Sequence, residues 1–441
     1  MTALSETKRY QAYPEYKNSG IEWVGDIPST WQVKPTFALF DPHADKNIDG
    51  LETNVLSLSY GRIIQRDVDK NFGLLPESFN TYQIVNSGDI ILRLTDLQND
   101  KRSLRVGLAK QRGIITSAYL KLVAKSELAP RFGYRLLHSY DTTKVFYGMG
   151  GGLRQSMKFE DFRRLPILLP SLQEQTQIAN FLDHETAKID TLIEKQQQLI
   201  KLLKEKRQAV ISHAVSAKDG ERAAKLSYFT DLLSGYAFPS SGFKQEPSDA
   251  ISLLRGINVG VDHIKWNETV YWPASDAPKL KEFVLEEGDI VFGMDRPWIS
   301  SGARVAEIKN SDLPCFLLQR VARIRSLEGT YQPFVKLCLA SNEFKRFVEA
   351  DLTGVSVPHI SPEQIKSFPI RAIGYEKQKY VTDLALANCK KLDEIEKKAE
   401  KAINLMQERR TALISAAVTG KIDVRNWQAP THQDQALEQT A

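Results

Sequence analysis

The sequence is poor in the residues that support cross-linked, metal-bound or membrane-spanning structures. Its 441 residues include only three cysteines, Cys315, Cys338 and Cys389, and no two of them form a Cys-x-x-Cys pair. This spacing excludes a disulfide framework and a cysteine-rich zinc site. No run of about 18 apolar residues occurs, which excludes a transmembrane helix, and residues 1–10 lack the apolar stretch of a secretion signal. The sequence therefore predicts a cytoplasmic protein that does not associate with membranes.

The signatures of common enzyme classes are missing as well. The chain has no GxxxxGK[ST] phosphate loop, no Asn-Pro-Pro or Asp-Pro-Pro motif of amino-methyltransferases, and no Pro-Asp…Glu-x-Lys nuclease pattern. None of the seven histidines falls at HxxxH or HExxH spacing, so no zinc-hydrolase site is predicted. We expect no catalytic residues, no metal site and no cofactor bound by this chain.

One glycine cluster, residues 148–152, is the nearest approach to a phosphate-binding loop. Such a loop needs a strand before it and a helix start directly after it, and the cluster lacks that supporting motif. Arg154 and Lys158 follow the cluster and are candidate contacts to a DNA phosphate. The simpler interpretation of the cluster is a flexible turn.

The chain contains an internal repeat with a period of about 200 residues. Residues 88–90 (Gly-Asp-Ile) recur as residues 288–290, and the offset between matched landmarks stays within 199–203 residues along the chain. The further landmark pairs are Arg105 and Arg304, Gly151 and Gly354, Glu160 and Glu363, Pro166 and Pro369, Gln175 and Gln378, and Arg207 and Arg410. So many matches in one order indicate a duplication.

Each half contains a globular segment followed by one long helix. The globular segments have short apolar runs with β-branched residues between Gly, Pro, Asn and Asp turns, which predicts a mixed α/β structure with considerable strand. Within the second segment, Ser361 as N-cap, Pro362 and the capping-box residue Gln364 predict the start of a short helix.

The two long helices are expected over about residues 172–215 and 376–418. Apolar residues recur in them at heptad spacing, and a helix of about 40 residues is roughly 60 Å long, more than a small domain is wide. The two seams are therefore expected to pair with each other. The predicted seam residues are Leu182, Ile189, Leu192, Leu199, Leu203, Val210, Leu392, Ile395, Ala399, Met406 and Leu413, together with Ala385 and Ala402.

The predicted fold class is α+β, with two homologous mixed α/β domains joined by two long antiparallel coiled-coil helices in pseudo-twofold symmetry. We place the globular domains at residues 1–170 and 218–370 and the helices at residues 171–217 and 371–420. The remaining residues, 421–441, are expected to form a disordered tail.

Several segments resemble the specificity subunits of type I restriction–modification systems. Residues 13–17, 19–28 and Trp31 look like the opening segment of that family, and residues 234–242 look like the start of its second target-recognition domain. The pairs at residues 165–166, 169–170, 174–175 and 178–179 resemble the start of its first conserved helix. The resemblance covers about residues 13–424. It is weaker at residues 376–378, where Glu-Lys-Gln stands in place of the usual Glu-Gln.

The resemblance implies a non-catalytic subunit in a prokaryotic cytoplasm. In that family each globular domain reads one half of a bipartite, asymmetric site on double-stranded DNA, and the coiled coil sets the spacer between the halves. The helices dock two adenine methyltransferase subunits, which bind S-adenosylmethionine and flip the target adenine out of the duplex. Nuclease/translocase subunits complete the restriction enzyme. Inserting four residues near residues 195–201 is then expected to lengthen the spacer by one or two base pairs.

Because 59 Lys and Arg stand against 54 Asp and Glu, giving a net charge of only +5, a DNA-binding surface must be local. Sequence readout typically uses Arg for guanine and Asn or Gln for adenine. The candidates in the first domain are Arg62, Arg66, Arg93, Arg102, Arg105 and Arg112, besides Arg154 and Lys158. The candidates in the second are Arg255, Asn258, Arg296, Trp298, Arg304 and His359. For each arginine the alternative is a surface charge or an intradomain ion pair, and for Trp298 it is burial in the core.

Two other interpretations stay open at this point. A DNA-independent scaffold or adaptor explains the duplication and the missing catalytic motifs, and it would be favoured if no DNA bound even with a methyltransferase partner. An enzyme with an unrecognised active site in one globular domain is the second. A nuclease assay with divalent metal on the purified chain distinguishes the enzyme from the scaffold and from the specificity subunit.

Overall fold

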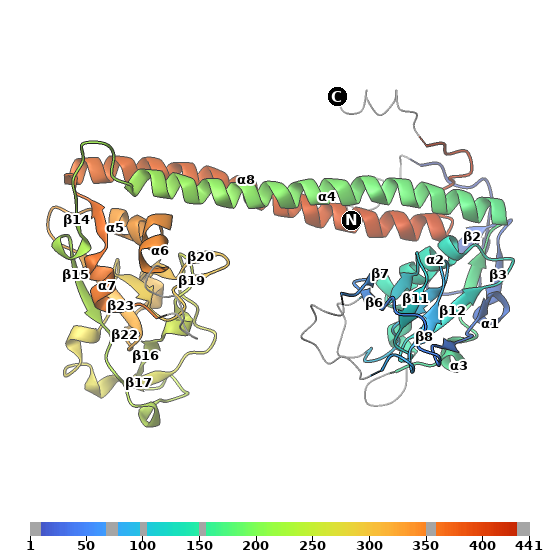
Figure 1. Cartoon of the computed structure of the whole chain (residues 1–441), viewed down its shortest axis with the longest axis horizontal. Helices are drawn as coiled ribbons and strands as arrows, with labels where there is room; N and C mark the ends of the chain where they lie inside the picture. The colour runs from blue at the N-terminus through green and yellow to red at the C-terminus, as the bar shows by residue number, and fades with distance from the viewer. Residues whose placement is uncertain (1–9, 68–77, 98–103, 150–155, 350–358, 430–441) are drawn as a thin grey trace. The chain divides into compact units, whose positions relative to one another are not determined.

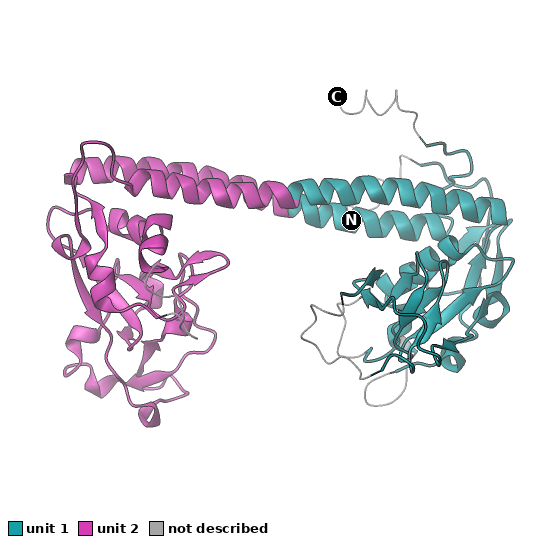
Figure 2. Cartoon of the chain, viewed as in Figure 1, with its two compact units in different colours: residues 1–196, 401–441 teal, residues 197–400 magenta. Residues whose placement is uncertain are grey.

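The computed structural model describes residues 10–67, 78–97, 104–149, 156–349 and 359–429. The chain divides into two compact units, coloured separately in Figure 2: residues 1–196 with 401–441 form unit 1, and residues 197–400 form unit 2. Each unit contains one globular domain and a part of each of two long helices, α4 (Leu172–Val215) and α8 (Tyr375–Val418), which Figure 1 labels.

The first globular domain is built around an antiparallel sheet with strand order β10-β9-β12-β4. A smaller sheet has the order β11-β8-β5, and β6 and β7 form a separate hairpin. Helix α2 (Pro130–Thr142) begins with a proline at its first turn, where the missing N–H costs nothing. The strands are β4 (Phe40–Asp41), β5 (Asp45–Lys46), β6 (Leu56–Ser59), β7 (Arg62–Gln65), β8 (Gln83–Val85), β9 (Ile90–Leu92), β10 (Val106–Leu108), β11 (Gly113–Ile115) and β12 (Leu120–Ala124).

The remaining elements of this domain connect it to the long helices. Strand β13 (Pro166–Leu169) leads into α4 and pairs with β3 (Gln32–Pro35), while β1 (Tyr16–Asn18) pairs with β2 (Asp26–Pro28). Short helices α1 (Thr36–Leu39) and α3 (Phe159–Phe162) lie between strands. One core contains Trp31 and Phe132 from the domain, Phe181 from α4 and Val418 from α8. The domain and the helix ends of unit 1 therefore share a single core.

The second globular domain repeats this plan. Its main sheet has the order β15-β23-β18-β21, and a second sheet has the order β17-β16-β22. Ile211 of α4 and Cys389 of α8 join the core of this domain, as Phe181 and Val418 do in unit 1. The strands are β14 (Ala223–Lys225), β15 (Thr230–Ser234), β16 (Ala250–Leu254), β17 (Tyr271–Pro273), β18 (Ile290–Gly293), β19 (Trp298–Ile299), β20 (Gly302–Ala303), β21 (Val305–Glu307), β22 (Cys315–Leu317), β23 (Val321–Ser326) and β24 (Pro369–Arg371), and the helices are α5 (Gln332–Leu339), α6 (Asn342–Glu349) and α7 (Pro362–Ser367).

Matching hydrogen bonds in the two units reproduce the internal repeat. Gln175 Nε2 donates to the Pro170 carbonyl at 2.9 Å and its Oε1 accepts from the Ala129 N–H at 2.7 Å. Gln378 makes the same pair of bonds with the Ile373 carbonyl at 2.7 Å and the Tyr331 N–H at 2.8 Å. The predicted α+β fold class, with two homologous domains and two long antiparallel helices, is confirmed. The predicted capping box at Ser361 and Gln364 is also present at the start of α7.

The long helices run antiparallel within each unit. In unit 1 Arg410 of α8 pairs with Asp190 of α4, and in unit 2 Lys204 of α4 pairs with Glu396 of α8. Of the predicted seam, four residues are buried, namely Leu182, Ile189, Leu203 and Ala399, and Ala385 is buried beside the second domain. Val210, Leu392, Ala402, Met406 and Leu413 are half-buried.

Three predicted seam residues do not lie in a seam. Leu192, Leu199 and Ile395 are 50%, 37% and 43% exposed, so the prediction for them is wrong. An α-helix with 3.6 residues per turn drifts by about 20° per heptad, so a strict seven-residue count leaves the contact stripe over a long helix. These side chains lie on the helix surface instead.

The disordered tail predicted for residues 421–441 is wrong for its first part. Ile422 and Val424 are 0% and 1% exposed, and the Trp427 ring packs edge-on against Phe181 with centroids 5.4 Å apart. Residues 421–429 therefore belong to the core of unit 1, and the rest of the predicted tail lies outside the described residues.

Candidate nucleic-acid interface

The same turn follows the central strand of the main sheet in both units. After β9 the chain passes through Asp96 with φ +57°, and after β18 it passes through Arg296 with φ +44°. Residues with side chains rarely adopt this left-handed conformation, and such strain persists only where surrounding contacts enforce it. A repeated arginine supplies those contacts: Arg105 Nη1 donates to the Thr95 carbonyl at 2.7 Å, and Arg304 Nη1 donates to the Asp295 carbonyl at 2.8 Å.

The DNA contact predicted for Arg105 is wrong, because its side chain is buried. Arg105 is 0% exposed, and its guanidinium also donates to the Arg93 carbonyl at 3.2 Å and the Asp96 carbonyl at 3.1 Å. The Nε of Arg105 donates to the Tyr147 hydroxyl at 3.2 Å. Arg105 therefore holds the turn and the strand end in place and presents nothing to a ligand.

Arg304 has the corresponding position in unit 2. Its Nε donates to the Val259 carbonyl at 2.9 Å, in addition to the bond to Asp295. Burial lowers the pKa of the Arg304 guanidinium, although the nearby Asp295 opposes this effect. The two bonds to backbone carbonyls assign Arg304 to the support of the turn.

The other candidates of the first domain are nearer the surface. Arg62 is exposed and lies 3.6 Å from Asp190 on α4, and exposed Arg112 donates to Glu52 at 3.0 Å. Arg66 and Arg93 are half-buried, and Lys158 is exposed at the start of α3. Arg102 and Arg154 lie outside the described residues. The same holds for residues 150–152 of the glycine cluster, which include the repeat landmark Gly151, and for its counterpart Gly354.

Two candidates of the second domain have structural roles. Asn258 is 2% exposed; its Nδ2 donates to the Lys265 carbonyl at 2.7 Å and its Oδ1 accepts from the Arg255 N–H at 3.0 Å. The base contact predicted for Asn258 is therefore wrong, because both ends of its amide are used inside the fold. The Trp298 ring is half-buried and packs against Phe344 at the edge of the core, with centroids 5.6 Å apart.

The remaining candidates of this domain lie around a charged cluster that the sequence analysis missed in part. Arg296 is exposed, half-buried Arg255 donates to the Glu268 carbonyl, and His359 joins Asp295 and Arg320. His359 Nδ1 lies 2.7 Å from Asp295 Oδ1, and Arg320 Nη1 lies 3.5 Å from the same oxygen. Arg320 and Asp295 were not predicted as site residues. A signal that could have found Arg320 is its difference between the halves, because the strand registers place the uncharged Ala118 at the equivalent position of the first half.

The globular domain of unit 2 is joined to the helices by a second charged group. Arg207 of α4 donates to Asp393 of α8 and to Asp262 of the domain, both at 3.1 Å, and Lys336 lies 3.1 Å from Asp262. Burial acts to lower the pKa of Arg207, but Asp262 and Asp393 outweigh it and raise the pKa above its usual value. Next to these residues lies a cavity of about 160 Å³, which Cys389 and Leu386 also line.

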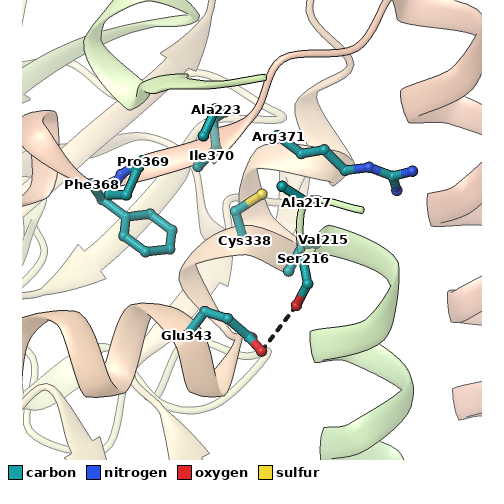
Figure 3. A pocket seen from close by; sticks show the side chains of 10 residues that line it. All are labelled: Val215, Ser216, Ala217, Ala223, Cys338, Glu343, Phe368, Pro369, Ile370 and Arg371. Atoms are coloured by element: carbon teal, nitrogen blue, oxygen red, sulfur yellow. Dashed lines mark hydrogen bonds between the residues drawn. The ribbon is translucent and has the colours of Figure 1, made fainter. Parts of the chain in front are cut away.

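A smaller cavity of about 120 Å³ lies where α4 ends against β24, and Figure 3 shows the side chains that line it. Ser216 donates to Glu343 at 3.0 Å across one side, and the buried Cys338 thiol lies at the centre of the group (Figure 3). Burial raises the pKa of this thiol, which makes it a poor nucleophile at neutral pH. We therefore interpret this cavity as a gap in the packing beside the end of α4 and not as a reactive site.

Within the five described segments, no group of three or more His, Cys, Asp or Glu residues is arranged to hold a metal ion. Helices in the same segments are all too short or too polar to cross a membrane. The three cysteines are buried and unpaired.

Comparison with known proteins gives one consistent result. Residues 75–202 match the family described as the type I restriction modification DNA specificity domain. The chain is 28% identical over 360 residues to the type I restriction enzyme MjaVIII specificity subunit of Methanocaldococcus jannaschii, covering 78% of this chain and 81% of that protein. It is 33% identical over 187 residues to the EcoAI specificity subunit of Escherichia coli, covering 41% of this chain and 31% of that protein.

Solved structures share the fold over most of the chain. A chain from a study of complex assembly and conformational transition in a type I restriction–modification system superposes with a TM-score of 0.69 at 15% identity, covering 89% of this chain and 98% of that one. The HsdS subunit of Thermoanaerobacter tengcongensis superposes with a TM-score of 0.51 at 16% identity, covering 90% and 98%. These structures show that the chain shares the fold of type I specificity subunits, and the sequence matches are likewise to type I restriction–modification specificity subunits, the DNA-recognition components of those systems.

Proposed function

We propose that this chain reads a bipartite, asymmetric site on double-stranded DNA for a type I enzyme of the prokaryotic cytoplasm. Each globular domain recognises one half of the site, and the paired helices set the spacer between the halves. Two adenine methyltransferase subunits dock on the chain and carry the S-adenosylmethionine, while nuclease/translocase subunits complete the restriction enzyme.

The observation that carries this proposal is a shared scaffold with different side chains on it. Arg105 and Arg304 hold the same left-handed turn in the two units, yet the turn presents Asp96 in one and Arg296 in the other. The exposed Arg296 guanidinium can donate hydrogen bonds to base edges, and the first domain has no arginine at the equivalent position of the turn. Two related domains that read different half-sites require this combination.

The helices have the properties of a ruler. Each has 44 residues without a break, which corresponds to about 66 Å at 1.5 Å per residue. A continuous helix holds a fixed length, whereas a flexible linker of the same size samples many. The insertion test should lengthen both helices at equivalent places, because four extra residues in α4 alone would shift its register against α8.

Exposed apolar residues on the helices support the docking of two methyltransferases. Leu192 and Ile395 occupy equivalent positions and are 50% and 43% exposed, and Leu202 and Leu405 are likewise 60% and 51% exposed. Apolar side chains at repeated surface positions mark a protein interface that occurs twice. Leu202→Asp and Leu405→Asp should therefore each remove one methyltransferase copy, and the double variant should remove both, as measured by native mass spectrometry.

Site selection tests the whole proposal. The chain is co-expressed with a type I methyltransferase, the complex is bound to random duplex DNA, and the retained molecules are sequenced. A two-part asymmetric motif with a fixed gap is the expected result. Retention without a motif, or no retention, would contradict the proposal and favour the DNA-independent scaffold.

A further inference from the structure

We propose that Arg320 reads a guanine in the half-site of the second domain and that Asp295 is the positioning residue that aims it. This inference rests on the proposed DNA-reading function and assigns a base contact to a residue that the sequence analysis did not select. Three separate segments of the second domain meet around these two residues.

Backbone hydrogen bonds join the three segments at one residue. The Met294 N–H donates to the Arg320 carbonyl at 3.0 Å, and the Met294 carbonyl accepts from the Ile360 N–H at 2.9 Å. The turn after β18, the turn before β23 and the segment that begins at His359 are thereby fixed to one another. Their neighbouring side chains, Asp295, Arg320 and His359, come together as a result.

The cluster holds Arg320 in a defined but accessible position. Asp295 Oδ1 lies 3.5 Å from Arg320 Nη1 and 2.7 Å from His359 Nδ1, so one carboxylate is shared by two basic groups. The Arg320 side chain is 56% exposed, and its guanidinium has five N–H donors, of which this contact engages one end. A long side chain that is already held loses less conformational entropy when it binds DNA.

The backbone of Arg320 is strained in the same way as the supported turn. Its φ is +72°, a left-handed conformation that residues with a side chain rarely adopt and that glycine adopts freely. Keeping an arginine there places its side chain at a sharp turn between two strands. Strained non-glycine residues of this kind cluster at functional sites.

The cluster of Asp295, Arg320 and His359 has no counterpart of the same residue types at the equivalent described positions of the first domain. The strand registers equate Arg320 with Ala118, because Ile324 lies opposite Ile290 where Leu122 lies opposite Ile90. The Met157 N–H donates to the Leu94 carbonyl as Ile360 does to Met294, which equates His359 with Ser156.

Asp295 corresponds to Thr95, since each gives its carbonyl to the supporting arginine. The three positions that carry Asp, Arg and His in the second domain thus carry Thr, Ala and Ser in the first, on a scaffold that is otherwise shared. Because the two half-sites differ, residues that read bases should differ between the units, whereas the supporting residues should not. Arg320 meets this criterion and is an arginine, the residue that makes bidentate hydrogen bonds to guanine O6 and N7.

The test is site selection with the complete chain–methyltransferase complex and four variants. Arg320→Ala should abolish the preference for guanine at one position of one half-site, a change of about 5- to 150-fold in relative affinity at that position. Arg320→Lys keeps the charge but lacks the planar fork, so it should lose most of the same preference. Asp295→Asn should keep the motif and weaken binding by roughly 2- to 10-fold through lost positioning. The matched control is Arg222→Ala. Arg222 is an exposed arginine of the same unit and lies directly before the first residue of β14.

The unchanged half-site serves as an internal control for folding. A variant complex that still selects the first-domain half-site is folded and assembled, so a loss confined to the other half is a loss of reading. An unchanged motif for Arg320→Ala overturns the inference. Uniform weakening on all sequences with a smaller salt dependence also overturns it, because that is the behaviour of a phosphate contact. If the wild-type complex itself selects no motif, it is the proposed function that fails.

Discussion

Arg410 donates to Asp190 at 2.9 Å between α8 and α4 of unit 1, and the same pair recurs in unit 2 as Arg207 and Asp393 at 3.1 Å. Each pair has a third member from its own globular domain, and the third members have opposite charges. In unit 1 Arg62 lies 3.6 Å from the carboxylate, whereas in unit 2 Asp262 accepts from the guanidinium at 3.1 Å. The repeated helix pair is therefore the element on which each domain is fixed.

Removing the guanidinium from the two pairs should have unequal effects. Arg410→Met removes one ion pair whose aspartate side chain is 36% exposed, so we expect a loss of about 0.5–1 kcal/mol in the free energy of unfolding. Arg207→Met removes two ion pairs from a guanidinium of similar exposure, 29% against 23% for Arg410, so the loss should be about twice as large. Urea unfolding followed by circular dichroism measures both. Equal losses would show that Asp262 does not fix the second domain to α4.

Exchanging the two charges of the unit 1 pair should restore only part of the stability. The combination Arg410→Asp with Asp190→Arg remakes the helix contact but places the new arginine beside Arg62. Adding Arg62→Ala should then raise the melting temperature of the exchanged variant, although the same change in the wild type lowers it or leaves it unaltered. Differential scanning calorimetry of the four proteins tests this sign reversal, and a fall in both backgrounds would contradict it.

Two arginines that look alike in the sequence should behave differently when removed. Arg105→Ala leaves the carbonyls of Arg93, Thr95 and Asp96 without their buried donor, which should cost roughly 3 kcal/mol or more. Arg112→Ala, whose side chain is 62% exposed, should change stability by no more than about 0.5 kcal/mol. The urea midpoints of the two variants give the comparison. Similar midpoints would show that the Arg105 guanidinium does not support the turn.

The contrast between these arginines explains what the sequence predicted well and what it did not. The repeat predicted two domains and two long helices, because Gln175 and Gln378 or Arg207 and Arg410 recur in one order and make matching contacts. The same repeat held the information that Arg105 and Arg304 are structural. Residues shared by both halves belong to the common scaffold, whereas residues proposed to read different half-sites must differ between the halves, as Arg320 and Ala118 do.

Burial was the part that residue type did not reveal. Asn258 has the right side chain to read adenine, but its amide is used by the Arg255 N–H in a local capping box and by the Lys265 carbonyl, and residue type alone does not reveal either bond. The exposed seam residues Leu192 and Ile395 show a related limit, because a helix with 3.6 residues per turn drifts away from a strict heptad count and the count alone does not place every apolar residue in the contact.

The start and the end of the described chain meet at one buried carboxylate. Glu174 Oε1 accepts from the Tyr13 hydroxyl at 2.6 Å and from the Trp31 Nε1–H at 2.9 Å, and Arg425 lies 5.0 Å from the centre of the Tyr13 ring. Burial and the bond to Glu174 raise the pKa of the Tyr13 hydroxyl, so it stays a donor at all moderate pH.

Loss of this acceptor should release the first described segment. Glu174→Ala leaves two buried donors unpaired, and we expect a loss of about 2–4 kcal/mol together with faster hydrogen exchange in residues 10–31. Glu174→Gln keeps an acceptor of the same size and should cost about 1 kcal/mol. Hydrogen exchange followed by mass spectrometry resolves the segment. Unchanged exchange in the alanine variant would show that the aromatic packing alone holds these residues.

Stability should depend on pH through one buried histidine. His138 lies on α2, is 4% exposed, and has Arg135 and Arg410 nearby. Burial, followed by the two positive charges, lowers the pKa of its imidazole from 6.5 to about 4, so the folded protein keeps it neutral. The unfolded chain binds a proton below pH 6.5 that the folded chain refuses, and stability therefore falls as the pH drops from 6.5 towards 4. Between pH 7 and pH 5 this effect amounts to about 2 kcal/mol.

The matched variant is His138→Gln, which has a polar side chain of similar size that does not titrate. Carboxylates that lose ion pairs in acid weaken both proteins alike, so the difference between them isolates the histidine. We expect the free energy of unfolding of the wild type to fall by about 2 kcal/mol more than that of the variant between pH 7 and pH 5. Parallel pH profiles in urea unfolding would contradict the prediction, because they would mean that His138 titrates equally in the folded and unfolded chains although its side chain is buried beside Arg135 and Arg410.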